Sequence, residues 1–423
     1  MSAARRILFL TPQLPYPPQQ GTAIRNFNLL ARLARRHMVD LLTFLQPGDH
    51  LTPDSPLHRL CRTIVAVPAP RRTLADRLCA TLTSPLPDMA LRLESPEMWR
   101  RLRELMQQQT YDIVQIEGIE MASYGLAMAG VRLTPGAATI EPQIPRPRLV
   151  FDDHNAEYVL QQRAFQTDMR MPSRWTAALY SLLQWQKLRR YERAICQRVD
   201  AVVAVSPADA AALQRLLPDL RPTVIPNGVD LVLYALDQIC PLDLGPAALV
   251  FTGKMDFRPN VDAVQWFVPI LARVRRAVPE ARFFVIGRQP HPRIARLAAD
   301  PTVVVTGQVA DTRPYIAGAA VYVVPLRVGG GTRLKVLEAM ALGRAIVSTR
   351  LGVEGLDVAD GRELRLADTP EAFAQAVVEL LQNPELRTRL GAAARAFVEA
   401  RYGWDRIVPD MERLYARVSH PAA

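Results

Sequence analysis

GGGTRLKVLEAM, residues 329–340, joins an apolar, strand-like run at 320–326 to an amphipathic helical segment. Glycines let the backbone approach a ligand closely and adopt positive φ. The free N–H groups of a helix start, together with Arg333 and Lys335, form a site for an anion. Glu338 lies three residues beyond Lys335 and shares its helix face. These residues therefore suit a nucleotide-binding site, with the phosphates at the helix start and the ribose hydroxyls on Glu338. The alternative is an ordinary Gly-rich turn followed by a solvated Lys335–Glu338 ion pair, because the same residues would form it.

Length and composition predict a two-domain globular protein. The chain has 423 residues, of which 49% are hydrophobic and 22% charged, and a single core seldom serves so long a chain. No apolar run reaches the roughly 18 residues that span a bilayer. Residues 1–11 pass directly into an apolar run, which we interpret as a first strand and not as a signal peptide. Four cysteines lie far apart without metal-ligand spacing, which favours a reduced, cytoplasmic setting: Cys61, Cys79, Cys196 and Cys240.

The net charge of +11 indicates a surface that attracts anions. Nucleic acid, anionic lipid and phosphorylated substrates all fit such a charge. The arginines are scattered, with pairs at 35–36, 71–72 and 189–190, and no nucleic-acid-binding motif is present. We therefore expect no nucleic-acid partner.

Short apolar runs alternate with helical segments along the whole chain, which predicts the α/β class with doubly wound parallel sheets. Two such series, each of Rossmann size, are expected to face a central cleft, because ligands bind beyond the carboxyl ends of the strands. The predicted division is an N-terminal domain at 1–218, a hinge at 219–246, a C-terminal domain at 247–403 and a returning C-terminal helix at 404–423. The predicted strands are 7–11, 39–45, 63–67, 112–117, 149–153, 201–206, 248–253, 282–287, 302–307, 321–326 and 345–349.

Three loops that follow predicted strands carry candidate site residues. The Pro-rich loop 11–22 ends at Gly21 and a helix start, which suits either a diphosphate contact or a rigid connection. His154 follows a strand end, where a histidine is well placed for a site, and its neighbours Asp152 and Asp153 could orient it. Lys254 stands directly behind a strand-ending glycine and could bind phosphate or be an ordinary loop lysine.

Taken together, these motifs resemble glycosyltransferase family 4, whose members have the GT-B fold. The ordered set covers nearly the whole chain: the Gly21 loop, VVAVS at 202–206, IPNGVD at 225–230, FTGK at 251–254, FVIG at 284–287, TG at 306–307, LEAMALG at 337–343 and YGWD at 402–405. The resemblance implies a retaining transferase that uses a nucleoside diphosphate sugar, UDP- or GDP-linked, and that needs no metal and no other cofactor.

The resemblance also assigns roles to single positions. Glu338 matches the acid that binds the nucleotide ribose, and His154 matches the histidine against the donor sugar. The remaining matches are to the donor phosphates: Gly21, Lys254, Gly331, Thr332, Arg333 and Lys335. Gly330 stands at the donor-sugar position, where the family usually has an acid, and Pro259 stands where a second diphosphate cation is usual. Arg258 or Arg333 could compensate.

The acceptor is the least defined part of the prediction. Glu117, at the end of a strand in the N-terminal half, could contact acceptor hydroxyls. The helical run 174–198 carries Trp175, Tyr180, Trp185 and Tyr191 among six cations, which suits either an anionic membrane surface or a solvated basic side. We expect a glycan or lipid-linked acceptor of cell-envelope or exopolysaccharide synthesis, at the inner face of the cytoplasmic membrane. The alternatives are a non-hydrolysing sugar-nucleotide epimerase and a non-catalytic binding protein of an envelope-assembly complex.

Overall fold

The computed structural model describes residues 4–133, 140–141, 143–169, 174–329 and 333–419. The chain divides into two compact units. Unit 1 comprises residues 1–226 and 408–423, and unit 2 comprises residues 227–407. Helix α16 (Trp404–Ser419) therefore begins in unit 2 and ends in unit 1.

Unit 1 is built on a parallel sheet of seven strands in the order β3-β2-β1-β4-β5-β6-β7. Apolar runs form most of these strands, and the strands inside the sheet are buried on both faces, as expected of a parallel sheet covered by helices. The strands are β1 (Arg6–Thr11), β2 (Met38–Leu45), β3 (Thr63–Pro68), β4 (Ile113–Glu117), β5 (Arg148–Asp153), β6 (Ala201–Ala204) and β7 (Thr223–Val224). The sequence did not predict β7, whose two residues are too few to show a pattern.

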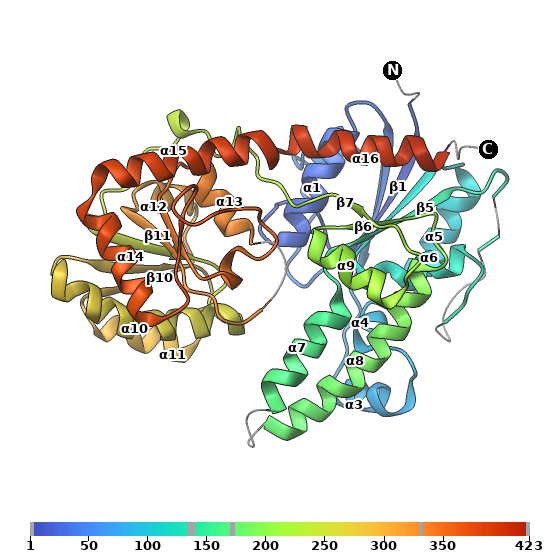
Figure 1. Cartoon of the computed structure of the whole chain (residues 1–423). Coiled ribbons are helices and arrows are strands. Elements are labelled where there is room, and N and C mark those ends of the chain that lie inside the picture. The colour runs from blue at the N-terminus through green and yellow to red at the C-terminus, as the bar shows by residue number, and fades with distance from the viewer. Residues whose placement is uncertain (1–3, 134–139, 142, 170–173, 330–332, 420–423) are drawn as a thin grey trace. The chain divides into compact units, whose positions relative to one another are not determined.

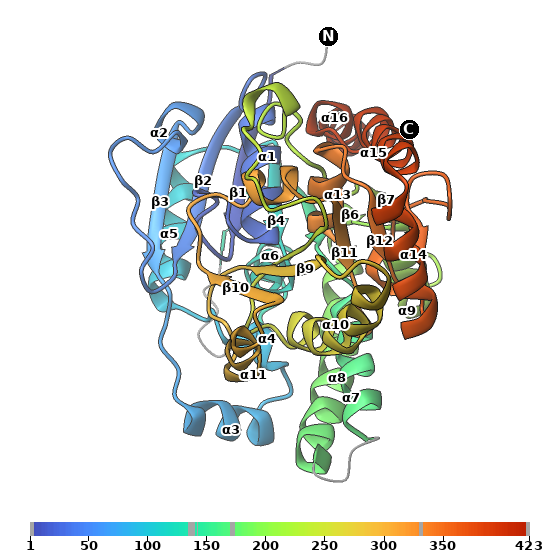
Figure 2. The same cartoon turned by 90° about the vertical axis from the view of Figure 1, so that its left-hand side faces the viewer.

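Helices connect and cover these strands. They are α1 (Gly21–Leu33), α2 (Leu57–Leu60), α3 (Leu74–Thr83), α4 (Asp88–Leu91), α5 (Pro96–Gln108), α6 (Ala122–Met128), α7 (Glu157–Met169), α8 (Trp175–Cys196) and α9 (Pro207–Leu216). Helices α7 and α8 pack on each other and, with α3, extend away from the sheet in both views (Figures 1 and 2). None of the helices within the described residues is both long and apolar enough to span a bilayer.

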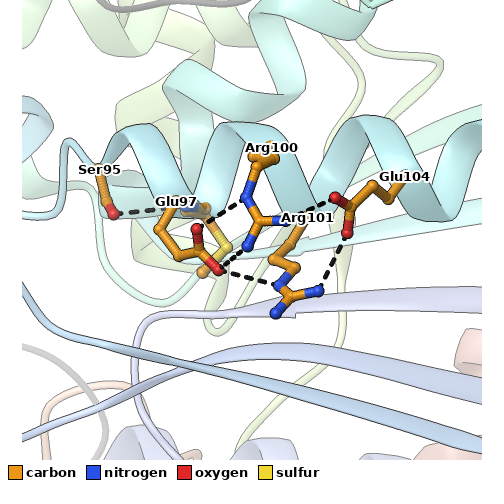
Figure 3. A network of polar contacts seen from close by, with 6 residues as sticks. Ser95, Glu97, Arg100, Arg101 and Glu104 are labelled. Carbon is orange, nitrogen blue, oxygen red and sulfur yellow. Dashed lines mark hydrogen bonds and ion pairs between the residues drawn. The ribbon is translucent and has the colours of Figure 1, made fainter.

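The solvent-facing side of α5 carries a network of ion pairs (Figure 3). Arg100 donates to Glu97 at 2.6 Å and to Glu104 at 2.7 Å, while Arg101 donates to the same two carboxylates at 2.9 and 3.1 Å. All four side chains are between 35% and 48% exposed. Exposed pairs of this kind contribute little to stability, about 0–1 kcal/mol each.

Unit 2 has a parallel sheet of six strands in the order β10-β9-β8-β11-β12-β13. These are β8 (Ala248–Thr252), β9 (Arg282–Ile286), β10 (Val303–Gly307), β11 (Val321–Val324), β12 (Ile346–Ser348) and β13 (Arg365–Leu366). Its helices are α10 (Arg258–Ala277), α11 (Pro292–Ala295), α12 (Arg313–Ala317), α13 (Leu334–Ala341), α14 (Pro370–Gln382) and α15 (Pro384–Arg401). The two-residue strand β13 was not predicted either. Both units thus have the predicted doubly wound parallel architecture.

Candidate active site

In unit 1 the polar side chains converge where strands β4 and β5 end. The two strands are parallel neighbours, and their register places Glu117 beside Asp152. His154 follows β5 by one residue, and its Nε2 lies 2.7 Å from Oε2 of Glu117. The Glu117 side chain is fully buried, whereas His154 keeps 13% of its side-chain surface exposed. The carboxylate therefore lies behind the imidazole and fixes its orientation.

Both oxygens of Glu117 have hydrogen-bond partners. Oε1 accepts from Nε2 of Gln115 at 3.1 Å. The Asn26 amide, in the orientation that satisfies both its ends, donates to Oε2 at 2.7 Å. The acceptor contact expected of Glu117 stays a prediction, but its burial and these bonds suit a residue that positions His154.

Asp152 forms a buried ion pair with Arg25 of α1. The guanidinium donates from Nε at 2.9 Å and from Nη2 at 3.1 Å to the two carboxylate oxygens, and both side chains are at most 1% exposed. Nη1 also donates to the carbonyl of Pro226 at 3.1 Å. Burial raises the pKa of Asp152 to about 6, an effect that Arg25 opposes and Glu117 reinforces. Above that pH the pair is ionised and anchors α1 to the end of β5.

The surroundings of His154 favour its protonated form. Burial alone would lower its pKa, but the hydrogen bond and charge of Glu117, with the charge of Asp152, raise the pKa above its ordinary value of 6.5. The other ring nitrogen faces Gly118, where a Cβ would lie 3.5 Å from Nδ1. Gly118 has a φ of +80°, which favours glycine there.

Glu117, Asp152 and His154 also place one ligand atom each within 4.8 Å of one another, a donor set that a divalent cation could use. Arg25 already neutralises Asp152, and both oxygens of Glu117 are hydrogen bonded. A cation would have to share the site with a guanidinium. We therefore describe this group as an ion-pair network that orients His154.

Asp153, adjacent in sequence, belongs to a different cluster. Glu192 of α8 accepts from the backbone N–H groups of Glu157 and Tyr158 at 2.8 and 3.0 Å and so caps α7. Burial first, and then the charge of Glu192, raise the pKa of Asp153 well above its ordinary range. Asp153 thus belongs to the carboxyl cluster around Glu192, and of the two aspartates it is Asp152 whose charge raises the pKa of His154.

In unit 2 the residues of interest lie on the first turns of α13. The Nζ atom of Lys335 is 2.9 Å from Oδ1 of Asn260 and 4.0 Å from the ring centroid of Phe251. A Cβ at Gly253 would lie 2.9 Å from that Nζ, so the glycine leaves room for the ammonium group. Burial, and then repulsion from Arg333, lower the pKa of Lys335 to about 7, while Glu338 opposes this shift. Lys335 is therefore a poorly solvated cation at the end of β8.

Glu338 stands one turn further along α13. Its carboxyl group is hydrogen bonded to Tyr234, and burial raises its pKa against the opposing effects of Tyr234 and Lys335. Tyr234 was missed by the sequence reasoning, since a tyrosine in a loop 104 positions earlier carries no local signal. The predicted phosphate ligand Lys335 and ribose ligand Glu338 are thus brought together in a half-buried site.

The other predicted donor ligands differ in their surroundings. Lys254 is 48% exposed and pairs with Asp256 at 3.3 Å. Arg333 precedes α13 at its N-cap position, and its guanidinium packs beside Gly329. Gly21 is the exposed first residue of α1 in unit 1. Three predicted site residues, Gly330, Gly331 and Thr332, lie outside the described residues.

Comparison with known sequences identifies the family. Residues 19–233 match the family described as Glycosyltransferase Family 4, and residues 246–383 match the family described as Glycosyl transferases group 1. The chain belongs to glycosyltransferase family 4. The matched region takes in His154 and its carboxylates in the first half, and Lys254, Lys335 and Glu338 in the second.

Relatives of this family 4 member include the phosphatidyl-myo-inositol mannosyltransferase of Mycobacterium tuberculosis, with 30% identity over 214 residues. That match covers 47% of this chain and 55% of the relative, so the chain spans about half the length of the curated relatives it matches. Among solved structures, sucrose-phosphate synthase from Thermosynechococcus elongatus has a TM-score of 0.70 at 20% identity, covering 98% of this chain and 99% of the other. The Anabaena protein HepE in complex with UDP has a TM-score of 0.64 at 16% identity, covering 97% and 99%. These likenesses confirm the GT-B fold.

Proposed function

We propose that the protein is a retaining glycosyltransferase that moves a sugar from a nucleoside diphosphate sugar to a glycan or lipid-linked acceptor. The observation that carries the proposal is that Lys335 and Glu338 lie on the same side of the first turns of α13, each in a partly buried position. Lys335 provides a cation with little competing solvation, and Glu338 provides a carboxyl group for the ribose hydroxyls. Both stand in the region that matches the group 1 glycosyltransferases.

Departure of the nucleotide builds negative charge on the diphosphate. Lys335 lies at the carboxyl end of β8, where its ammonium gains more from a phosphate than a fully hydrated cation would. We assign Arg333 and Lys254 to the diphosphate as further positive charges. Backbone N–H groups for the same phosphates are assigned to Gly21, Gly331 and Thr332. Gly330 accommodates the donor sugar without the usual acid. UDP- and GDP-linked donors are both considered, and solved relatives bound to UDP and UDP-glucose favour testing UDP first.

We assign His154 to the donor sugar, as the family resemblance implies. Glu117 holds its Nε2 and raises its pKa, so the imidazole is oriented and tends toward the cationic form. A hydrogen-bond donor held in this way can stabilise oxygen atoms of the sugar during transfer. Its role is supported by the buried network behind it, in which Asp152 and Arg25 compensate each other's charge.

Among the possible acceptors, a lipid-linked one is favoured by the names of the relatives. The relative from Mycobacterium tuberculosis is named for transfer of mannose to phosphatidyl-myo-inositol, a membrane lipid. We therefore propose a role in cell-envelope or exopolysaccharide synthesis, with the protein at the inner face of the cytoplasmic membrane and attracted there by anionic lipid.

The direct test is a transfer assay with UDP- and GDP-sugars and lipid extracts, in which the anomeric configuration of the product is read by NMR. The proposal predicts a glycosylated lipid or glycan with the anomeric configuration of the donor. Inversion would contradict retention. Conversion of the sugar nucleotide without acceptor would point to an epimerase, and binding without turnover to a non-catalytic protein; either result would overturn the proposal.

A further inference from the structure

Helix α3 presents an apolar face to solvent. Leu74, Leu78 and Leu82 are 74%, 62% and 80% exposed. Their spacing of four residues puts them on one side of the helix. The contact of α3 with the rest of unit 1 is polar instead, because Thr81 is its buried residue and Arg77 pairs with Asp88 at 3.5 Å. The helix thus touches the domain through a small polar contact and leaves its leucines uncovered, whereas a surface helix of a globular domain buries its apolar face.

Helix α8 has a similar face in its first turns. Trp175, Leu179 and Leu183 follow the same spacing and are 59%, 60% and 38% exposed. The two helices are neighbours: the Nζ atom of Lys187 donates to the carbonyl of Thr81 at 2.6 Å. Figures 1 and 2 both show α3 and the start of α8 at the same end of unit 1. We call the six side chains together the apolar end of unit 1: Leu74, Leu78, Leu82, Trp175, Leu179 and Leu183.

Positive charge adjoins the apolar end. Segment 157–198 has eight Lys and Arg residues against three Asp and Glu residues. Arg190 and Arg193 are exposed on the α8 face that carries the apolar side chains, two to three turns further along. Nearby acids are already paired, Asp88 with Arg72 and Asp168 with Arg174, each at 2.9 Å. The order along α8 is therefore apolar side chains first and arginines next.

We propose that the apolar end of unit 1 inserts into the interface of an anionic lipid bilayer. Leucine and tryptophan side chains bury in the boundary between head groups and acyl chains, while arginines bind lipid phosphates above it. The charge of segment 157–198 favours a lipid surface over a second copy of this chain, whose same segment would repel it. The inference rests on the proposed function, because it names the surface that brings the enzyme to a lipid-linked acceptor.

The test is co-sedimentation of the full chain with vesicles of phosphatidylcholine alone and of phosphatidylcholine with phosphatidylglycerol. We expect binding to the anionic vesicles that weakens at high salt. The triple variant L74S/L78S/L82S should lose at least about tenfold in partitioning. The matched control V232S/L236S, which alters two exposed apolar side chains of unit 2, should bind as the wild type does. The double variant R190Q/R193Q should lose the preference for anionic lipid.

Absence of vesicle binding by the wild type, or equal binding by the α3 variant, would overturn the proposal. A dimer in sedimentation velocity that the α3 variant abolishes would assign the surface to a second copy and also overturn it. Circular dichroism and nucleotide binding of the α3 variant should match the wild type, because the replaced leucines face solvent. Failure of the proposed function is seen separately, as absence of sugar transfer to any acceptor while vesicle binding persists.

Discussion

The imidazole of His154 and the carboxylate of Glu117 form a 2.7 Å contact in which the acid is fully buried and the histidine reaches the surface. The two residues end or follow neighbouring parallel strands, so the sheet itself sets their separation. This pairing gives His154 a pKa above its ordinary value of 6.5 despite its burial.

Replacing Glu117 with Gln should lower the pKa of His154, because the charge and the strongest hydrogen bond that favour the imidazolium are removed. The pKa is measured by NMR titration of the histidine ring signals, with Glu97→Gln on the exposed side of α5 as the matched control. An unchanged His154 pKa in Glu117→Gln would contradict the assigned pairing.

The same pair makes stability depend on pH with a defined sign. The folded chain holds the His154 proton more tightly than the unfolded chain, whose value is 6.5. The contribution of the pair is therefore complete below about pH 6.5 and is lost as the pH rises through the raised pKa. The difference in unfolding free energy between wild type and Glu117→Gln, measured by urea denaturation, should shrink over that interval. A difference that grows with pH would contradict this sign.

Two adjacent aspartates should lose different amounts of stability when each is replaced by asparagine. Asp152→Asn removes the charge that compensates Arg25 and should cost about 3–5 kcal/mol. Asp153→Asn should cost less than Asp152→Asn, because burial and the charge of Glu192 already disfavour the ionised form of the Asp153 carboxyl group. Urea unfolding followed by circular dichroism measures both. Equal losses would contradict the separate environments of the two side chains.

The arginines of unit 1 provide a second contrast. Arg25→Met should lower the unfolding free energy by about 3–5 kcal/mol, since it leaves Asp152 buried without its cation. Arg100→Met on the exposed network of α5 should lower it by less than about 1 kcal/mol. Urea unfolding measures the loss of unfolding free energy in both variants. A larger loss for Arg100→Met than for Arg25→Met would contradict the expected order.

Lys335 should take up a proton when a nucleotide binds. Its pKa of about 7 leaves part of the ammonium deprotonated above neutrality, and a bound diphosphate favours the charged form. Affinity for UDP or GDP should therefore fall as the pH rises above about 7. Calorimetry in buffers of different ionisation enthalpy measures the uptake, which Lys335→Met should abolish. Lys254→Met is the control that should keep it, and uptake that survives Lys335→Met would assign the proton elsewhere.

The fold could be predicted from the sequence to a large extent, because apolar runs bounded by turn residues mark most strands of a doubly wound sheet. The predicted strand 39–45 and the observed β2 differ by a single residue at one end. Strands β7 and β13 were not predicted, because a strand of two residues is too short to show a periodic pattern. The candidate ligands Lys335 and Glu338 on α13 could also be proposed from the sequence, since their spacing of three residues places them on one face of a helix.

Pairings across the sequence could not be predicted in this way. Nothing in the local sequence distinguishes Arg25 from the other arginines, yet it lies buried against Asp152, 127 positions away. The contact of Glu117 with His154 was not predicted either, and it follows from the register of β4 with β5. A usable signal was present, because two neighbouring parallel strands that both end in acids bring those acids together.

The measurement that tests the central proposal most directly is a thermal-shift panel of UDP-, GDP- and ADP-sugars on the wild type, Glu338→Ala and the control Glu385→Ala. At saturating ligand we expect at least one nucleotide sugar to raise the melting temperature of the wild type and of Glu385→Ala by about 2–4 °C or more. Glu338→Ala should lose most of that shift, since it lacks the carboxyl group assigned to the ribose. If no nucleotide sugar stabilises the wild type, or if Glu338→Ala responds equally, the donor site on α13 is wrong.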